Sequence, residues 1–127
     1  MSSRKKILII DDEEDVLKYL AAFFKENDYY VILAHDGREG VKKALSEKPD
    51  IITLDISMPG ESGVKALREL QNGESTKKIP IIIITGVASD FKRFITGRKQ
   101  VHMPEGYFEK PIDRNLLLNK VKEILKL

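Results

Sequence analysis

The feature that most constrains this chain is a series of five short apolar runs, separated by longer segments rich in polar residues. The runs are continuous rather than alternating, and isoleucine dominates three of them. Continuous runs of this length are typical of strands that are covered on both faces, as in a parallel sheet. The predicted strands are Ile7–Ile10, Tyr30–Ala34, Ile51–Leu54, Ile81–Ile84 and Gly106–Phe108.

Helical periodicity fills the segments between these runs. Apolar residues recur there at spacings of three or four, which places them on one face of a helix. The stripes are Val16, Leu17, Leu20 and Phe24; Val41, Ala44 and Leu45; Val64, Leu67 and Leu70; and Leu117, Val121, Ile124 and Leu125. Within residues 87–104, Phe91, Phe94 and Ile95 favour a short fourth helix, whereas Gly97 to Glu105 lacks clear periodicity. Strand and helix therefore alternate along the chain.

Capping signals agree with this alternation. Asp36 followed by Glu39 resembles a capping box at the start of the second helix. Ser62 is expected to cap the third helix, Gly73 to end it, and Asp113 to cap the last helix. These signals place helix boundaries between the predicted strands.

Alternating strands and helices predict right-handed crossovers and a doubly wound α/β fold. The expected architecture is a flavodoxin-like (βα)5 fold, a five-stranded parallel sheet of strand order 2-1-3-4-5. The sequence contains no internal linker, repeat or low-complexity segment, so residues 1–127 are expected to form a single domain. Ligands of such folds bind at the carboxyl ends of the first and third strands, where the strand order reverses.

Composition excludes several classes of protein. No uncharged apolar stretch approaches the roughly 20 residues that a bilayer requires, so no membrane span is expected. The absence of cysteine removes disulfides and thiolate sites, and with no signal-peptide pattern it predicts a cytoplasmic protein. The net charge of +2 does not indicate nucleic-acid binding, but acids are concentrated in residues 1–64. His35 and His102 lack metal-ligand spacing and are predicted to be ordinary surface or satisfied residues.

Three acids follow two of the predicted strands. Asp11 and Asp12 come directly after the first strand, and Asp55 comes directly after the third. The predicted strand order brings these residues together at one edge of the sheet. Carboxylates that converge repel one another unless protons or a hard divalent cation neutralise them, and Mg²⁺ suits such a site.

The remaining strand ends carry residues that suit phosphate chemistry. The fourth strand ends at Thr85, a small hydroxyl donor, and the fifth is followed by Lys110. A lysine opposite a carboxylate–metal cluster is a recurring arrangement in phosphoryl transfer. Glu13, Glu14 and Asp15 are expected only to complement the dipole of the helix that follows them.

With these residues in place, the chain resembles the receiver domain of two-component response regulators over essentially its whole length. The motifs that carry the resemblance are Ile7-Leu8-Ile9-Ile10-Asp11-Asp12-Glu13, Leu54-Asp55-Ile56-Ser57-Met58-Pro59-Gly60 with Gly63, Thr85, and Lys110-Pro111. Two positions depart from the family pattern. Gly86 replaces the usual alanine, and Ile112 stands where an aromatic residue commonly follows Lys-Pro.

The resemblance implies that Asp55 is a phospho-acceptor. The phosphoryl donor would be the phosphohistidine of a sensor histidine kinase or of a phosphotransfer protein. By the same resemblance Mg²⁺ would be held by Asp11, Asp12, Asp55 and the main-chain carbonyl of Ser57. The expected protein is a single receiver without an output domain, a signalling switch rather than an enzyme.

The resemblance also implies a switching mechanism. Thr85 would hydrogen-bond the phosphoryl group, Lys110 would pair with it, and Tyr107 would turn inward when Thr85 moves. The Lys110–Pro111 bond is expected to be cis. The surface of the fourth helix, fifth strand and fifth helix would change its affinity for a downstream protein target. This is expected in a monomer or a phosphorylation-dependent dimer, without direct contact with nucleic acid or membrane.

Other interpretations stay open at this point. One is a docking module of the same fold that works without phosphorylation, although all the expected acids are present. A phosphohydrolase of the haloacid dehalogenase type would need an aspartate where the chain has Ser57. A flavin binder would need a loop that cradles phosphate, which the acids after the first strand would repel. A basic segment is either a solvated face or a docking surface for an acidic partner; it contains Lys92, Arg93, Arg98 and Lys99.

Overall fold

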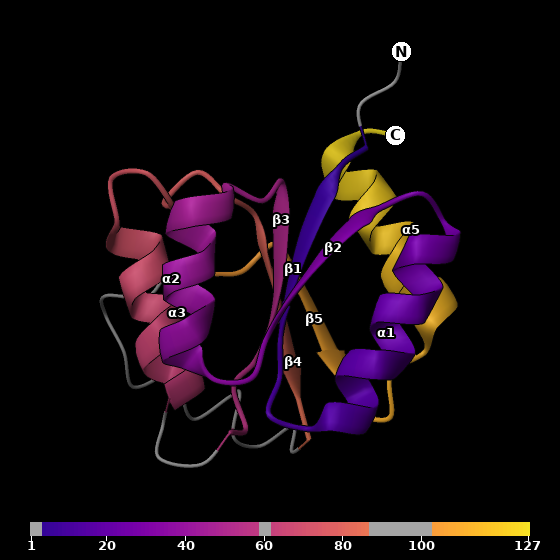
Figure 1. The fold of residues 1–127 in the computed structure, drawn as a ribbon, viewed down its shortest axis with the longest axis horizontal. Helices are drawn as coiled ribbons and strands as arrows, with labels where there is room; N and C mark the ends of the chain where they lie inside the picture. The colour runs from indigo at the N-terminus through magenta and orange to yellow at the C-terminus, as the bar shows by residue number, and fades with distance from the viewer. Residues whose placement is uncertain (1–3, 59–61, 87–102) are drawn as a thin grey trace.

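The computed structural model describes residues 4–58, 62–86 and 103–127. Within these ranges the elements form three layers, with a sheet between two layers of helices (Figure 1). The strands are β1 (Lys6–Ile10), β2 (Tyr30–Ala34), β3 (Ile51–Asp55), β4 (Ile81–Thr85) and β5 (Gly106–Glu109). The helices are α1 (Glu14–Glu26), α2 (Gly37–Glu47), α3 (Ser62–Asn72) and α5 (Arg114–Leu125). The predicted fourth helix, the basic segment and His102 lie outside the described residues.

The five strands form one parallel sheet of order β2-β1-β3-β4-β5, which confirms the predicted doubly wound fold. β1 lies between β2 and β3, and Ile10 pairs with Ala34 on one side and with Leu54 on the other. Each predicted strand is correct to within one residue at either end. The strand order reverses between β1 and β3, so the carboxyl ends of these two strands share one edge of the sheet.

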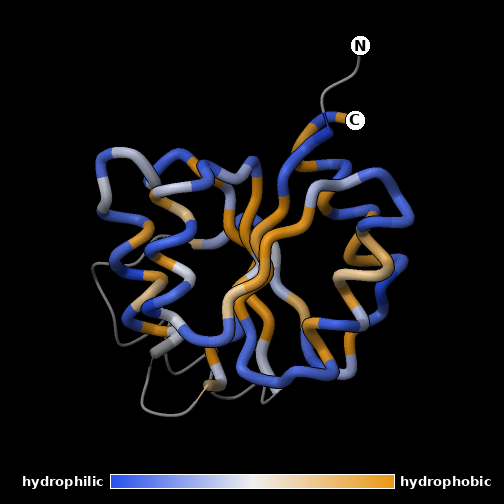
Figure 2. Tube along the Cα trace, viewed as in Figure 1, coloured by the Kyte–Doolittle hydropathy of each residue, from blue (hydrophilic) through white to orange (hydrophobic). Residues whose placement is uncertain are grey.

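Both faces of the sheet are buried, which explains the continuous apolar runs. Ile7 and Ile9 of β1 pack in the core beneath α1 and α5, whereas Leu8 and Ile10 pack in the core beneath α2 and α3. Successive side chains of a strand point to opposite faces, so a strand covered by helices on both sides needs apolar residues at every position. Figure 2 shows the hydrophobic strands in the middle layer and helices that are hydrophobic mainly toward them.

The helix boundaries lie at or next to the predicted capping residues. Asp36 Oδ1 accepts a hydrogen bond from the Glu39 backbone N–H at 2.8 Å, and Asp113 caps α5 through two backbone N–H groups of its first turn. Glu39 does not complete the predicted capping box, because its carboxylate accepts from the backbone N–H of His35 at 2.6 Å. Across the ranges that the structure describes, no helix has the length and apolar content needed to cross a membrane.

Candidate functional site

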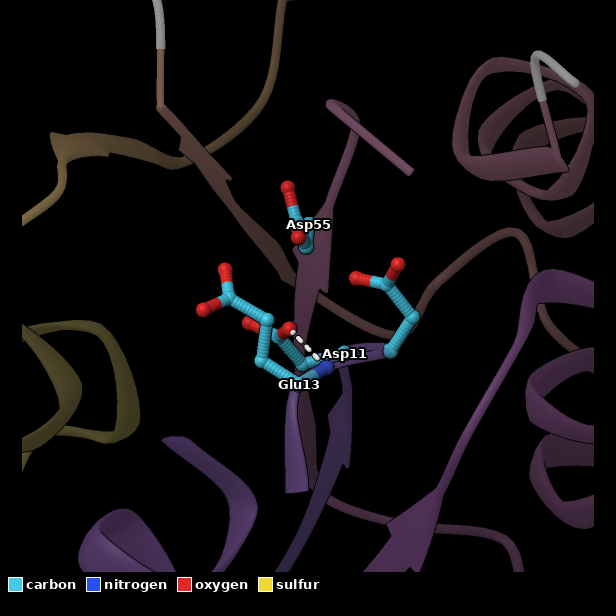
Figure 3. A group of neighbouring side chains, drawn as sticks. Asp11, Glu13 and Asp55 are labelled. Carbon is cyan, nitrogen blue, oxygen red and sulfur yellow. Dashed lines mark hydrogen bonds between the residues drawn. The ribbon is translucent and has the colours of Figure 1, made fainter. Parts of the chain in front are cut away.

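Three acids meet at the carboxyl edge of the sheet. Asp11 directly follows β1 and Asp55 ends β3, and the residues before them, Ile10 and Leu54, pair across the two strands. Asp11 is 2% exposed and Asp55 is 1% exposed, whereas Asp12 is exposed. Figure 3 shows Asp11 rising from the loop after β1 beside Asp55 on the neighbouring strand. The structure therefore brings together the acids that the strand order predicted.

Lys110 reaches these acids from the end of β5. Its backbone N–H donates to the carbonyl of Thr85 at 2.9 Å, which anchors the residue beside β4. Its side-chain Nζ lies 3.0 Å from Asp11 Oδ2, 3.2 Å from Asp55 Oδ2 and 2.6 Å from Glu13 Oε1. An ammonium group has three N–H donors, so these three carboxylates match its capacity.

The two carboxylate oxygens of Asp55 have different partners. Oδ1 accepts from the backbone N–H of Ser57 at 2.8 Å and from its hydroxyl at 2.6 Å. Oδ2 faces Lys110. The Ser57 hydroxyl in turn accepts from the backbone N–H of Gly86 at 3.3 Å, so it links the loop after β3 to the loop after β4. Asp55 is thus held in one orientation at the centre of the site.

Electrostatics in the site are set by burial and by an excess of acids. Burial is the largest cause that raises the pKa of Asp11 to about 6, and the charge of Asp55 adds to it. Hydrogen bonds from the Glu13 amide and from Lys110 oppose this increase. Burial by itself lowers the pKa of Lys110, but its contacts with Glu13, Asp11 and Asp55 outweigh burial and hold that pKa above its usual range. Lys110 is therefore charged while it contacts the acids.

The same acids form a set of oxygen donors for a cation. Asp11, Asp12, Glu13 and Asp55 each present a carboxylate oxygen, and these oxygens lie within 4.8 Å of one another. Carboxylate oxygens are the ligands that hard divalent cations prefer. Among the described residues, these four carboxylates outnumber the ammonium group of Lys110, so the site carries excess negative charge that a divalent cation would offset.

Gly63 allows α3 to begin directly against the end of β3. A Cβ atom at this position would overlap the carbonyl oxygen of Asp55 and lie 2.7 Å from the Cα of Ile56. Gly63 is the second residue of α3, and Ser62, predicted to cap the helix, is its first residue. The glycine in the motif is therefore required by close packing beneath Asp55.

The other predicted site residues occupy neighbouring strands. Thr85 is buried at the end of β4, opposite Glu109 of β5. Tyr107 is half-buried on β5 and packs against the core beneath α2 and α3. The Lys110–Pro111 peptide bond is cis, which confirms that prediction. Pro59 and Gly60 lie outside the described residues.

Glu13 is a site residue whose role the charge pattern did not predict. It was expected only to complement the dipole of α1, but it is the N-cap of that helix and its carboxylate contacts Lys110. Glutamate is not among the residues favoured at an N-cap, and its side chain makes no capping hydrogen bond. A glutamate at a helix start that does not favour it is therefore the sequence feature that could have indicated this role. Glu14 and Asp15 do lie in the first turn, as expected.

Comparison with known proteins agrees with the fold. The model of the response regulator receiver domain family matches residues 7–122. Protein PilH of Pseudomonas aeruginosa is 34% identical over 120 residues, which cover 94% of this chain and 97% of PilH. Several other relatives are longer, and the chain spans about half of their length.

Solved structures of similar sequence have the same fold. A receiver domain protein from Methanospirillum hungatei JF-1 has a TM-score of 0.85 and 28% identity, covering 98% of this chain and 95% of that one. A CheX–CheY–BeF3–Mg²⁺ complex from Borrelia burgdorferi has a TM-score of 0.76 and 30% identity, covering 95% and 89%. Together with the sheet order and the acids at its edge, these matches show that the chain belongs to the response regulator receiver domain family.

Proposed function

We propose that this receiver domain is a phospho-accepting switch in which Asp55 takes a phosphoryl group from a phosphohistidine. The donor would be a sensor histidine kinase or a phosphotransfer protein. The observation that carries the proposal is the environment of Asp55, a buried carboxylate with Lys110 on one oxygen and Ser57 on the other. A carboxylate nucleophile is effective when its orientation is fixed and a cation lies beside the reacting group.

The transfer moves one phosphoryl group from nitrogen to oxygen. A carboxylate oxygen of Asp55 attacks the phosphorus, an O–P bond forms, and the N–P bond of the phosphohistidine breaks with its electron pair left on the imidazole. Charge in this kind of transition state is spread over the peripheral phosphoryl oxygens. Lys110, which is 3.2 Å from Asp55, is placed to neutralise part of that charge. Thr85, at the end of the adjacent strand, would donate a hydrogen bond to the same group.

Mg²⁺ fits the donor set at this edge of the sheet. Asp11, Asp12, Asp55 and the main-chain carbonyl of Ser57 would hold the ion. When bound, it supplies positive charge that offsets the repulsion between these acids and an anionic phosphoryl group. The related complex from Borrelia burgdorferi includes Mg²⁺ and BeF3, which supports this assignment.

The output of the switch would be a change in affinity for a downstream protein. A phosphoryl group on Asp55 adds charge, and Thr85 and Lys110 would move toward it. Tyr107, half-buried on β5, would then turn inward and repack the surface formed by the fourth helix, β5 and α5. Residues 1–127 would act as a single receiver, either as a monomer or as a dimer that forms on phosphorylation.

Intact-mass spectrometry after incubation with acetyl phosphate tests the proposal. We expect one phosphoryl adduct on the wild type that requires Mg²⁺, and no adduct on Asp55→Asn. Asp15→Asn is a matched control, because it neutralises an exposed acid of the first turn of α1 and should accept the group normally. An adduct that persists on Asp55→Asn would contradict the assignment. No adduct from acetyl phosphate or from a phosphorylated histidine kinase would favour the docking module instead.

A further inference from the structure

Glu13 makes the shortest of the three ion pairs around Lys110. Its Oε1 lies 2.6 Å from Lys110 Nζ, compared with 3.0 Å for Asp11 and 3.2 Å for Asp55. Hydrogen bonds between a charged N–H and a carboxylate are shorter and stronger than those between neutral groups. The family resemblance gives Glu13 no part in phosphoryl transfer, yet its carboxylate is the nearest to the lysine that would bind the phosphoryl group.

The position of the Glu13 side chain is not explained by the helix that it begins. Glu13 is the N-cap of α1, but its side chain makes no capping hydrogen bond. Its backbone N–H donates to Asp11 Oδ1 at 2.9 Å, so the backbone is already anchored in the site (Figure 3). The side chain therefore lies beside Lys110 because of the ammonium charge and not because α1 needs a cap there.

Of the three carboxylates that contact Lys110, that of Glu13 can move away most easily. Its side chain is 59% exposed, whereas the side chains of Asp11 and Asp55 are each 2% exposed. It borders an open cavity of about 720 Å³ whose walls include Tyr19 and Ile112. A carboxylate that turns into water at an exposed position gives up little, because exposed ion pairs contribute little to stability. Asp11 and Asp55 have no such freedom.

We infer that Glu13 is a positioning residue that competes with the phosphoryl group for Lys110 and thereby slows the phosphorylation of Asp55. This rests on the proposed function of Asp55. Lys110 has three N–H donors and three carboxylate partners, so it binds a phosphoryl oxygen fully only when one carboxylate withdraws. Glu13 is the carboxylate that withdraws. Until it does so, its negative charge also repels an anionic phosphoryl donor.

The rate of phosphorylation by acetyl phosphate at saturating Mg²⁺ tests the inference. In this reaction an Asp55 oxygen attacks phosphorus, the bond from phosphorus to the acetyl oxygen breaks, and acetate leaves with the electron pair. Glu13→Gln keeps the length of the side chain and removes its charge. The rate should rise about threefold to tenfold, the range expected for one partly exposed charge close to the reacting group. An unchanged or lower rate would overturn the inference.

Glu14→Gln is the matched control for this experiment. It removes the same charge one residue along the chain, where the carboxylate contacts His35 at 3.1 Å. Its rate should stay close to that of the wild type. An increase equal to that of Glu13→Gln would show that the effect comes from the net charge rather than from the contact with Lys110, and would overturn the inference. Glu13→Ser is a second variant that gives α1 a favoured N-cap, so it should fold and should also react faster.

A measurement without Mg²⁺ tests the contact itself. The side-chain ¹⁵N resonance of Lys110 should shift in Glu13→Gln and remain unchanged in Glu14→Gln. A resonance that does not move in Glu13→Gln would contradict the inference. A wild type that is phosphorylated on Asp55 while Glu13→Gln reacts no faster would overturn this inference alone. A wild type that accepts no phosphoryl group would overturn the proposed function, and the inference with it.

Discussion

Two charged clusters lie near the start of α1, and they differ in burial. In the lysine cluster, formed by Lys110 with Asp11, Glu13 and Asp55, the lysine side chain is 15% exposed and two of the acids are 2% exposed. The histidine cluster consists of His35 with Glu14 and Glu39. Its side chains are 53%, 58% and 38% exposed, although both of its contacts are only 3.1 Å long.

The comparison shows that burial, more than contact length, decides how much free energy is lost when two charges are separated. Water weakens the attraction between exposed charges, and it costs little to separate them. Burial takes water away from the charged form of Asp11, which raises the pKa of Asp11 to about 6. Burial also removes the screening by water, so the loss of a partner becomes expensive. The lysine cluster is therefore expected to control chemistry and stability, and the histidine cluster only to adjust them.

Removing the buried cation should have the largest effect. Lys110→Met leaves Asp11 and Asp55 buried without the ammonium group that contacts both. In EDTA near neutral pH, we expect the free energy of unfolding to fall by about 3 kcal/mol, as when one partner of a buried ion pair is deleted. Urea denaturation measures this change. The control is Lys120→Met, which removes an ion pair with Glu123 at 3.6 Å on the surface of α5 and should cost under about 1 kcal/mol. If both variants lost the same free energy of unfolding, burial would not decide the cost of losing an ion-pair partner.

A substitution at Gly63, beneath the lysine cluster, should also lower the stability of the domain. Gly63→Ala forces a Cβ atom against the carbonyl of Asp55 and the Cα of Ile56. We expect a loss of about 2 kcal/mol in urea denaturation, because overpacking outweighs the better helix propensity of alanine. Gly86→Ala is the control, since its Cβ would lie 3.7 Å from Ser57 Oγ, an ordinary contact. If Gly86→Ala were as costly, close packing at Gly63 would not be the reason.

Relieving the excess of acid should stabilise the domain. Asp11→Asn removes one buried negative charge but keeps an oxygen that accepts from the Glu13 amide. In EDTA near neutral pH, the free energy of unfolding should rise by about 1 kcal/mol, because the charged form of Asp11 is disfavoured by burial and by Asp55. Mg²⁺ should stabilise the wild type more than this variant in thermal unfolding. A destabilised Asp11→Asn in EDTA would show that the acids do not repel one another at the site.

The difference between the clusters also explains what the sequence could predict. The strands were predictable to within a residue because both faces of the sheet are covered, and the acids followed from strand order and register. The contacts of Glu13 and His35 were not predictable, because they depend on where long side chains meet residues distant in sequence. Glu39 accepts from the backbone N–H of His35 rather than from that of Asp36, because local sequence signals do not show which of the two amides lies nearer.

The smallest effect is expected from His35→Gln in the exposed cluster. The hydrogen bond with Glu39 is the largest cause that raises the pKa of His35 above its ordinary value of 6.5, and the charges of Glu14 and Glu39 add to it. Protonated His35 therefore favours the folded state, and its contribution is fully present below pH 6.5 and is lost as the pH rises through the raised pKa. In thermal unfolding the wild type should have the higher Tm at about pH 5.5, and the two Tm values should converge by about pH 9.

Measurements at increasing salt concentration distinguish the electrostatic contribution of His35 from a packing effect. The difference in Tm at low pH should shrink as salt is added, because water and ions reach both contacts of His35. The loss caused by Lys110→Met should depend far less on salt, since Asp11 and Asp55 are shielded from solvent. A His35→Gln difference that persisted at high pH and high salt would mean that the ring, rather than its charge, stabilises the loop after β2. The conclusion that His35 contributes only a weak, exposed charge interaction would then be wrong.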